Sequence, residues 1–196
     1  MLPANSPSYH QAISRWFTRR HGWTPEIEWI RHAPGVVPAL AAAILAFTQP
    51  GDGVLVQPPV YYPFFTAIRG RGRTVVENPL LFKDGRFEMD YGDLEKKLED
   101  SSVKLVFLCS YNPWGASGPG RSSRPSPPYA PPKGLLSSPT KFTATSSSTA
   151  RNTSYASIPE EARDHSITTV APSKTFNIAG LSTAARRSSR RNGEER

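Results

Sequence analysis

Hydrophobic positions along the chain occur in two patterns: at helical spacing, and in short runs typical of strands. Ile13, Trp16 and Phe17 recur at helical spacing before the breaker at 21–25, and they predict an amphipathic helix. Further helices are predicted over 39–47 and 91–98, and strands over 27–30, 54–56, 74–77, 87–90, 103–109 and 167–170. Strands that alternate with helices favour an α/β fold in which helices flank a mostly parallel sheet.

Three turns follow the predicted strands, at the edge where open α/β sheets place their ligands. Gly35 precedes a helix whose first N–H groups could hold a phosphate, although an ordinary helix start is the alternative. Tyr61 or Tyr62, after two prolines, could stack on a flat ring. The structural interpretation of this stretch is a core aromatic cluster, which we assign to Phe64 and Phe65. Asn112-Pro113 forms a third turn, which could hold an amide toward a ligand or be purely structural.

Lys174 lies among small and hydroxyl residues, four residues after the end of the apolar run 167–170. A lysine at the end of a buried element loses its proton readily, and its amine can then attack a carbonyl group. The alternative is a surface lysine in a loop. The surrounding motifs decide between the two.

Composition places the chain among single-domain proteins of a reducing compartment. The chain has 196 residues, a low hydrophobic content of 37% and 20 prolines. Cys109, the single cysteine, offers no disulfide framework. No signal peptide is visible, and the longest apolar run, 36–47, is too short to span a bilayer. We therefore expect a cytoplasmic protein without a membrane partner.

The net charge of +8 suggests nucleic-acid binding until the charges are located. Residues 115–150 carry +4 and residues 182–196 carry +3, which leaves +1 for the rest of the chain. Because the basic excess lies in two stretches of unusual composition, we disfavour a nucleic-acid-binding protein.

Four motifs occur in a characteristic order: Gly35–Pro38, Pro59–Phe65, Asn112–Gly115 and Ser173–Asn177. Together they resemble the fold-type-I enzymes that depend on pyridoxal 5′-phosphate (PLP), the aminotransferase class I/II superfamily. Within it the closest branch looks like the cystathionine β-lyase or cysteine-S-conjugate β-lyase-like proteins. The resemblance covers roughly residues 10–114 and 153–184.

The resemblance implies a role for each motif. Lys174 would form the Schiff base with PLP, Tyr61 would stack on the pyridine ring, and Asn112 would bond the 3′-oxygen of that ring. The phosphate would be held by the backbone N–H groups of Gly35, Val36 and Val37, and by Ser173.

The resemblance also implies an activity for the intact protein. It would be a homodimer that eliminates thiol from an amino-acid substrate such as cystathionine, leaving pyruvate and ammonia. An aminotransferase and a non-catalytic remnant are the alternatives.

One required group is missing from the chain. The family places a carboxylate on the pyridine nitrogen, normally in a Ser-Asp-Glu-Ile-His strand between the Asn-Pro turn and the lysine. Here residues 115–150 hold seven Pro, nine Ser and no acid, a composition typical of a disordered linker. Such a stretch would remove strands from the middle of the sheet.

Back-translation explains this stretch. When the third base of each codon is joined to the first two bases of the next, residues 115–123 can encode Arg-Val-Trp-Thr-Arg-Glu-Glu-Leu. In the same offset, residues 137–145 can encode Val-Ser-Asp-Glu-Ile-His-Ser-Asp. Both are what the resemblance expects at these places, and two matches in one offset indicate that the stretch is read out of frame.

The predicted organisation has four parts. Residues 1–114 form the first part of the PLP-binding large domain, and 115–151 form the anomalous stretch. Residues 152–184 carry the lysine segment, and 185–196 are a basic tail that is disordered or again out of frame. From the resemblance we expect the N-terminal arm and the small C-terminal domain of the family to be missing. We therefore expect this chain to be inactive.

Overall fold

A computed structural model of the chain describes residues 6–21, 24–83, 86–110, 142–147, 165–182 and 184–188. Its helices are α1 (Pro7–His21), η1 (Ile27–Trp29), α2 (Val36–Phe47), α3 (Pro63–Arg69), α4 (Tyr91–Glu99), α7 (Ser173–Phe176) and η3 (Ala179–Leu181). Its strands are β1 (Ile30–Ala33), β2 (Gly53–Val56), β3 (Thr74–Glu77), β4 (Leu81–Lys83), β5 (Arg86–Glu88), β6 (Val103–Ser110), β7 (Phe142–Ser147), β8 (Ser166–Val170) and β9 (Ala184–Ser188). Among these helices, none has both the length and the apolar character needed to cross a bilayer.

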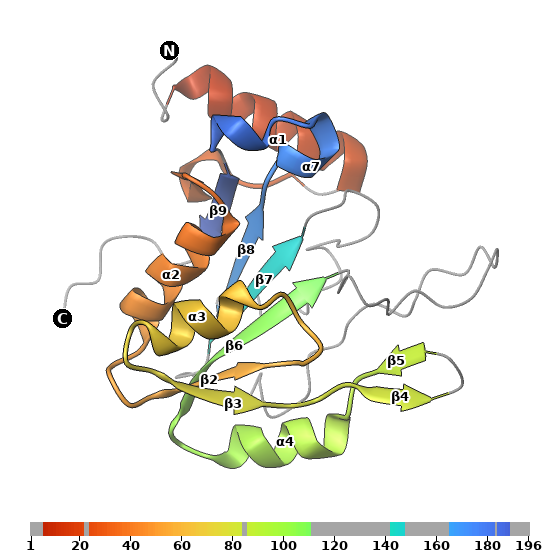
Figure 1. The fold of residues 1–196 in the computed structure, drawn as a ribbon. Helices are drawn as coiled ribbons and strands as arrows, with labels where there is room; N and C mark the ends of the chain where they lie inside the picture. The colour runs from red at the N-terminus through yellow and green to blue at the C-terminus, as the bar shows by residue number, and fades with distance from the viewer. Residues whose placement is uncertain are drawn as a thin grey trace.

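The main sheet has seven strands in the order β1-β9-β8-β7-β6-β2-β3 (Figure 1). Strand β9 is antiparallel to both of its neighbours, whereas the remaining pairs of neighbours are parallel. Since β1 and β8 are each antiparallel to β9, they run in the same direction. The predicted fold class, a mostly parallel sheet with flanking helices, is confirmed. A separate hairpin of β4 and β5 projects from the body.

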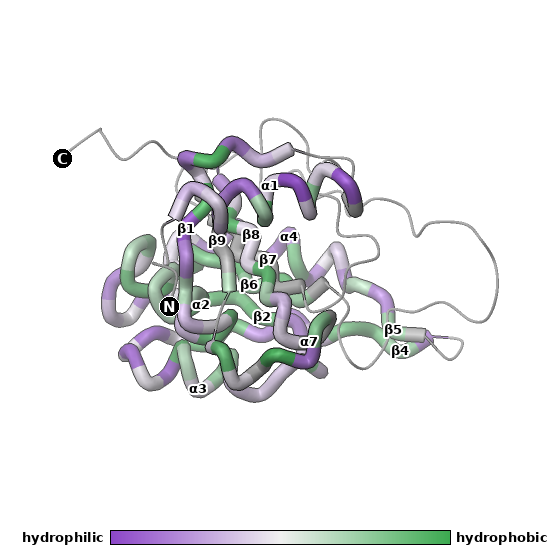
Figure 2. Tube along the Cα trace, turned by 90° about the horizontal axis from the view of Figure 1, so that it is seen from above, coloured by the Kyte–Doolittle hydropathy of each residue, from purple (hydrophilic) through white to green (hydrophobic). Residues whose placement is uncertain are grey.

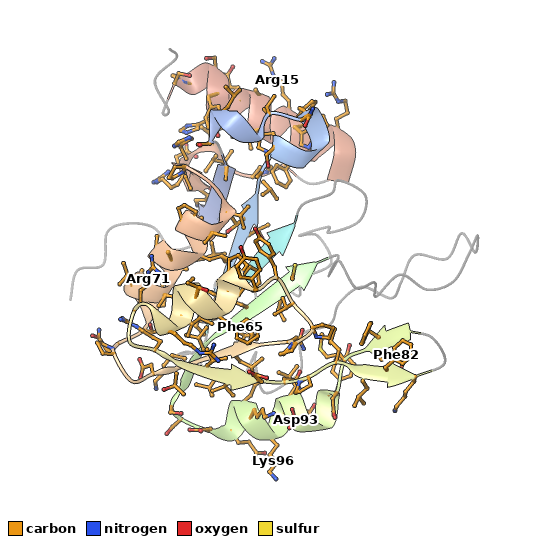
Figure 3. The ribbon with its side chains drawn as sticks, viewed as in Figure 1. Arg15, Phe65, Arg71, Phe82, Asp93 and Lys96 are labelled. Carbon is orange, nitrogen blue, oxygen red and sulfur yellow. The ribbon has the colours of Figure 1, made fainter. Side chains whose placement is uncertain are left out.

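Helices cover both faces of the sheet because side chains on a strand alternate between its two sides. On β2, Val54 and Val56 pack with residues of α2 and α3, whereas Leu55 packs with Leu94 and Leu98 of α4. Figure 3 accordingly shows Phe65 on α3 and Asp93 on α4 on opposite sides of the sheet. In Figure 2 the tube of α2 is largely hydrophobic and that of α1 largely hydrophilic, as their sequences require. The core therefore lies between α2, α3 and the sheet on one side, and under α4 on the other.

Local signals explain the two helices beside β3. Helix α3 begins at Pro63, where the missing N–H is not needed, and it buries Phe64 and Ile68 one turn apart. Helix α4 begins after Asp90, whose side chain accepts a hydrogen bond from the Asp93 N–H at 3.0 Å. The prediction of α4 is confirmed, whereas α3 is a helix that the sequence analysis did not predict.

Three expectations differ from the structure. Residues 27–29 form a 3₁₀ turn, and the strand expected at 27–30 lies over Ile30–Ala33. The expected loss of strands from the middle of the sheet is wrong at Phe142–Ser147, because β7 joins β6 to β8 with parallel ladders on both sides. Phe142 and the β-branched Thr143 and Thr145 suit a strand, whatever reading frame produced them. The first residues of the expected tail likewise form β9.

Candidate functional site

The candidate site lies at the edge of the sheet where its parallel strands end. Strands β1, β2, β6, β7 and β8 run in one direction, so the segments that follow them meet at one edge. The turns after β1, β2 and β8 hold Gly35, Tyr61 and Ser173 in turn. The fold thus brings to one edge three motifs that are far apart in the sequence.

The N-terminus of α2 forms a backbone cradle beside this edge. Gly35 is its N-cap, with φ 147° and ψ 169°, a conformation essentially restricted to glycine. A Cβ added to Gly35 would lie 3.4 Å from Cδ of Pro38. The first N–H groups of a helix have no partners inside the helix, and Pro38 offers none, so Val36 and Val37 present theirs outward. The donor set and the space left by the missing Cβ fit a phosphate.

Tyr61 lies in the loop between β2 and α3, with its side chain 49% exposed. Its ring is 6.3 Å from that of Phe64, nearly perpendicular to it, and Phe64 in turn packs edge-on against Phe107 at 5.6 Å. Phe64 is 2% exposed, which confirms its place in the core, whereas Phe65 is half-buried and packs against the same cluster. Tyr61 therefore packs against the aromatic core on one side and leaves about half of its surface available to a ligand.

Lys174 lies in α7, a single helical turn that begins three residues after the end of β8. The turn ends at Asn177, which adopts the left-handed conformation (φ 53°) and donates its N–H to the Ser173 carbonyl. The half-buried Ser173 is the first residue of this turn. The side chain of Lys174 lies outside the described part of the structure, so its role stays a prediction.

Val36 connects the three motifs. It packs against the core cluster that Val60 also contacts, and against the Ala33–Ala39–Ala184 cluster that Ala171 also contacts. The cradle therefore borders both the cluster that the tyrosine loop contacts and the cluster that the segment before the lysine turn contacts. Asn112, the fourth predicted member, lies outside the described residues, and Ser110 at the end of β6 is the described residue nearest to it in the chain.

Three residues with polar side chains are paired in register along the middle of this edge. Cys109, Ser146 and Thr169 are paired in register across β6, β7 and β8. Burial raises the pKa of the Cys109 thiol, so it stays protonated at neutral pH. Thr169 is 1% exposed, and its Oγ1 has no hydrogen-bond partner among the residues that the structure describes. Strand β7 contains no acid, so it supplies no carboxylate to a ligand at this edge.

One pair of buried residues beside the site was missed by the sequence analysis. The side chain of Gln57, at the end of β2, is hydrogen-bonded to that of Asn78, at the end of β3. A signal was present, because Asn78-Pro79 repeats the Asn-Pro pattern of residues 112–113 at the end of another strand.

A sheet of this order, with a helix N-terminus, a tyrosine and a lysine turn at its carboxyl edge, defines the class of fold-type-I PLP enzymes. The family model for aminotransferase class I and II matches residues 2–119, and the chain belongs to that family. The resemblance predicted from the four motifs is confirmed.

Individual relatives agree with the predicted branch. Cystathionine β-lyase PatB of Bacillus subtilis is 43% identical over 176 residues, which are 89% of this chain and 46% of that protein. Protein MalY of Escherichia coli is 31% identical over 53% of this chain and 27% of its own length. Cystalysin of Treponema denticola, solved with a pyridoxal 5′-phosphate cofactor, superposes with a TM-score of 0.79 at 33% identity, covering 94% of this chain and 47% of its own. The chain thus spans about half the length of PatB and of cystalysin, and a smaller share of MalY.

Proposed function

We propose that this chain binds pyridoxal 5′-phosphate through Lys174, and that the intact protein to which it corresponds is a carbon–sulfur β-lyase. The observation that carries the proposal is the position of the α2 N-terminus, the Tyr61 loop and the Ser173–Lys174 turn at one edge of the sheet, where Val36 packs against the two adjoining hydrophobic clusters. The similarity to PatB and to cystalysin supports the choice of cofactor and reaction.

Different residues would contact different parts of the cofactor. The N–H groups of Gly35, Val36 and Val37, together with the positive end of the α2 dipole, would hold the phosphate, with the Ser173 hydroxyl beside them. Tyr61 would lie against the pyridine ring, because its exposed half is supported from behind by Phe64. In this proposal Asn112 bonds the ring oxygen.

Lys174 would have a second role in the reaction. Its amine, when not bound to the cofactor, could remove the proton from Cα of the substrate. Pyridoxal phosphate, when bound, supplies an electron sink for the charge that proton removal leaves behind. The Cβ–S bond of cystathionine or another cysteine S-conjugate would then break, the sulfur would leave as a thiolate that takes up a proton, and water would convert the remaining three-carbon fragment to pyruvate and ammonia.

The chain itself should show little or no turnover. Residues 115–150, where the family holds its pyridine-nitrogen carboxylate, contain no acid. A ring nitrogen without a charged partner is a poor electron sink, and losing such a partner removes on the order of several kcal/mol of transition-state stabilisation. Robust lyase turnover by this polypeptide would contradict the out-of-frame reading of that stretch.

Borohydride reduction tests the proposal directly. The chain is incubated with PLP and reduced, and the peptide that carries the adduct is identified by mass spectrometry. We expect the adduct on Lys174, and we expect Lys174→Ala to lose it while Lys96→Ala, a change on α4, keeps it. Equal labelling of the Lys174→Ala protein and the parent would remove this lysine from its role.

Assembly and location are part of the same proposal. Exposed apolar side chains near the site, among them Tyr62 (74%) and Leu181 (69%), favour a homodimer of the intact protein that covers them. A single cysteine favours a reducing compartment, the cytoplasm. Because the family model describes aminotransferases, aminotransferase activity is the second candidate function.

A further inference from the structure

Two buried side-chain amides form a polar contact beneath the candidate site. Asn78 is fully buried and Gln57 is 8% exposed. Nε2 of Gln57 donates to Oδ1 of Asn78 at 2.9 Å. Burying an amide is unfavourable unless its hydrogen bonds are made. Because each of these two amides serves as a hydrogen-bond partner of the other, their contact fixes the relative position of the two segments that carry them.

The second end of Asn78 is fixed to helix α4. Its Nδ2 donates to Oδ2 of Asp93 at 2.7 Å and to the carbonyl of Asp90 at 3.1 Å. Asp93 also forms an ion pair with Lys97, one turn further along the helix, with 2.6 Å between Nζ and Oδ2. The side chain of Asn78 thus lies between the Asp93 carboxylate on α4 and the side-chain amide of Gln57.

The other side of the contact is the loop that carries Tyr61. Gln57 is followed by Pro58 and Pro59, which have no N–H to donate, so this part of the loop offers few backbone donors. The backbone continues alongside the segment of Asn78. The Asn78 N–H donates to the Val56 carbonyl at 2.9 Å, and the Leu80 N–H donates to the Pro58 carbonyl at 2.7 Å.

We propose that Gln57 and Asn78 are positioning residues, whose paired amides hold the Tyr61 loop in place for the cofactor ring. Neither residue needs to touch the ligand, because the contact acts on the start of the loop, four residues before Tyr61. The link to the cofactor rests on the proposed function, whereas the effect on the loop does not.

Hydrogen exchange followed by mass spectrometry tests the effect on the loop without PLP. Two variants remove the contact: Asn78→Leu, and the milder Gln57→Met, which keeps the length of the side chain. The control is Leu98→Ala, which removes a buried side chain from α4 and weakens the core under it. The reporters are the amides of Leu80, Phe64 and Phe65, whose acceptors are the carbonyls of Pro58, Tyr61 and Tyr62.

We expect the reporter amides to exchange at least tenfold faster in both contact variants, relative to the amides of β6. In Leu98→Ala the reporters and β6 should change together. If Asn78→Leu fails to fold, Gln57→Met alone decides. Parent-like exchange of the reporters in Gln57→Met, or a change no larger than that of β6, would overturn the proposal.

The cofactor arm uses the same proteins. The PLP concentration that gives half-maximal borohydride adduct on Lys174 should rise at least tenfold in Gln57→Met and should stay near the parent value in Leu98→Ala. If the parent forms no adduct, the proposed function fails, and the exchange data still decide whether the amides position the loop. An adduct with unchanged half-saturation in Gln57→Met would contradict the link to the cofactor.

Discussion

The indole ring of Trp16 packs edge-on against the ring of Phe176, with 5.2 Å between centroids and 62° between planes. Phe176 lies two residues after Lys174, in the short helix α7. Helix α1, at the start of the chain, therefore supports the turn that carries the proposed cofactor lysine.

Trp16→Ala should weaken cofactor binding through this contact. An aromatic pair contributes about 0.5–1.5 kcal/mol beyond the burial of its area, so the half-saturating PLP concentration should rise about two- to tenfold. The borohydride adduct on Lys174 measures it. Phe82→Ala, on the separate β4–β5 hairpin, is the matched control and should leave the value unchanged. If both variants bind PLP like the parent, α1 does not support the turn.

Gly35→Ala should damage both the fold and the phosphate cradle. The conformation of Gly35 is nearly closed to other residues and strain of this kind costs about 1–3 kcal/mol, so the free energy of unfolding in urea should fall by about this amount. PLP binding should weaken as well. Gly180→Ala is the control, because a Cβ added there meets nothing within 4 Å. Equal behaviour of the two variants would show that Gly35 is not required.

The Asp93 carboxylate should make stability depend on pH in the acid range. Hydrogen bonds from Lys97 and Asn78 hold its pKa below the ordinary value of 3.8. A lowered pKa in the folded state means that the stabilisation is complete above the pKa of the unfolded chain. It is lost as the pH falls through the lower pKa of the folded state. The stability advantage of the parent over Asp93→Asn, measured by urea unfolding, should therefore shrink below about pH 4. Glu95→Gln, a neutralised acid on the same helix, should not show this loss.

A full-length version with its reading frame restored should reveal the reaction type. We expect it to convert cystathionine or an S-alkyl cysteine to pyruvate without an added keto acid, because elimination needs only a leaving group at Cβ. Transamination also needs a second keto acid to accept the amino group. Measuring pyruvate with and without such an acceptor distinguishes the two. Product that appears only with the acceptor would replace the lyase by an aminotransferase.

Sequence patterns predicted the parts of the fold that local chemistry determines. The short apolar runs that became β2 and β6 are buried strands between turns, and their identity needs no distant partner. The positions of Gly35 and Tyr61 followed from the rule that ligands lie at the carboxyl edge of such a sheet. The structure confirms that both residues lie at that edge.

Other parts depend on contacts between distant segments. Strand β7 has only weak strand signals, and it is fixed by β6 and β8 on its two sides. The strand that begins at Ile30 was expected too early, because β9 determines which residues pair. The Asn-Pro pattern at 78–79 could have marked Asn78, but its contact with Gln57 joins two strand ends, and no pattern within one segment predicts that they meet.

The pairing of β1 with β9 constrains the order in which the protein can fold. Among the described strands β1 is paired with β9 alone, and Ala33 is paired with Ala184, about 150 residues further along the chain. Closing so long a loop is entropically unfavourable, and non-local pairing is slow. Gly35 follows β1 by two residues, so the phosphate cradle is joined to the strand whose pairing links the segments farthest apart in the described sheet.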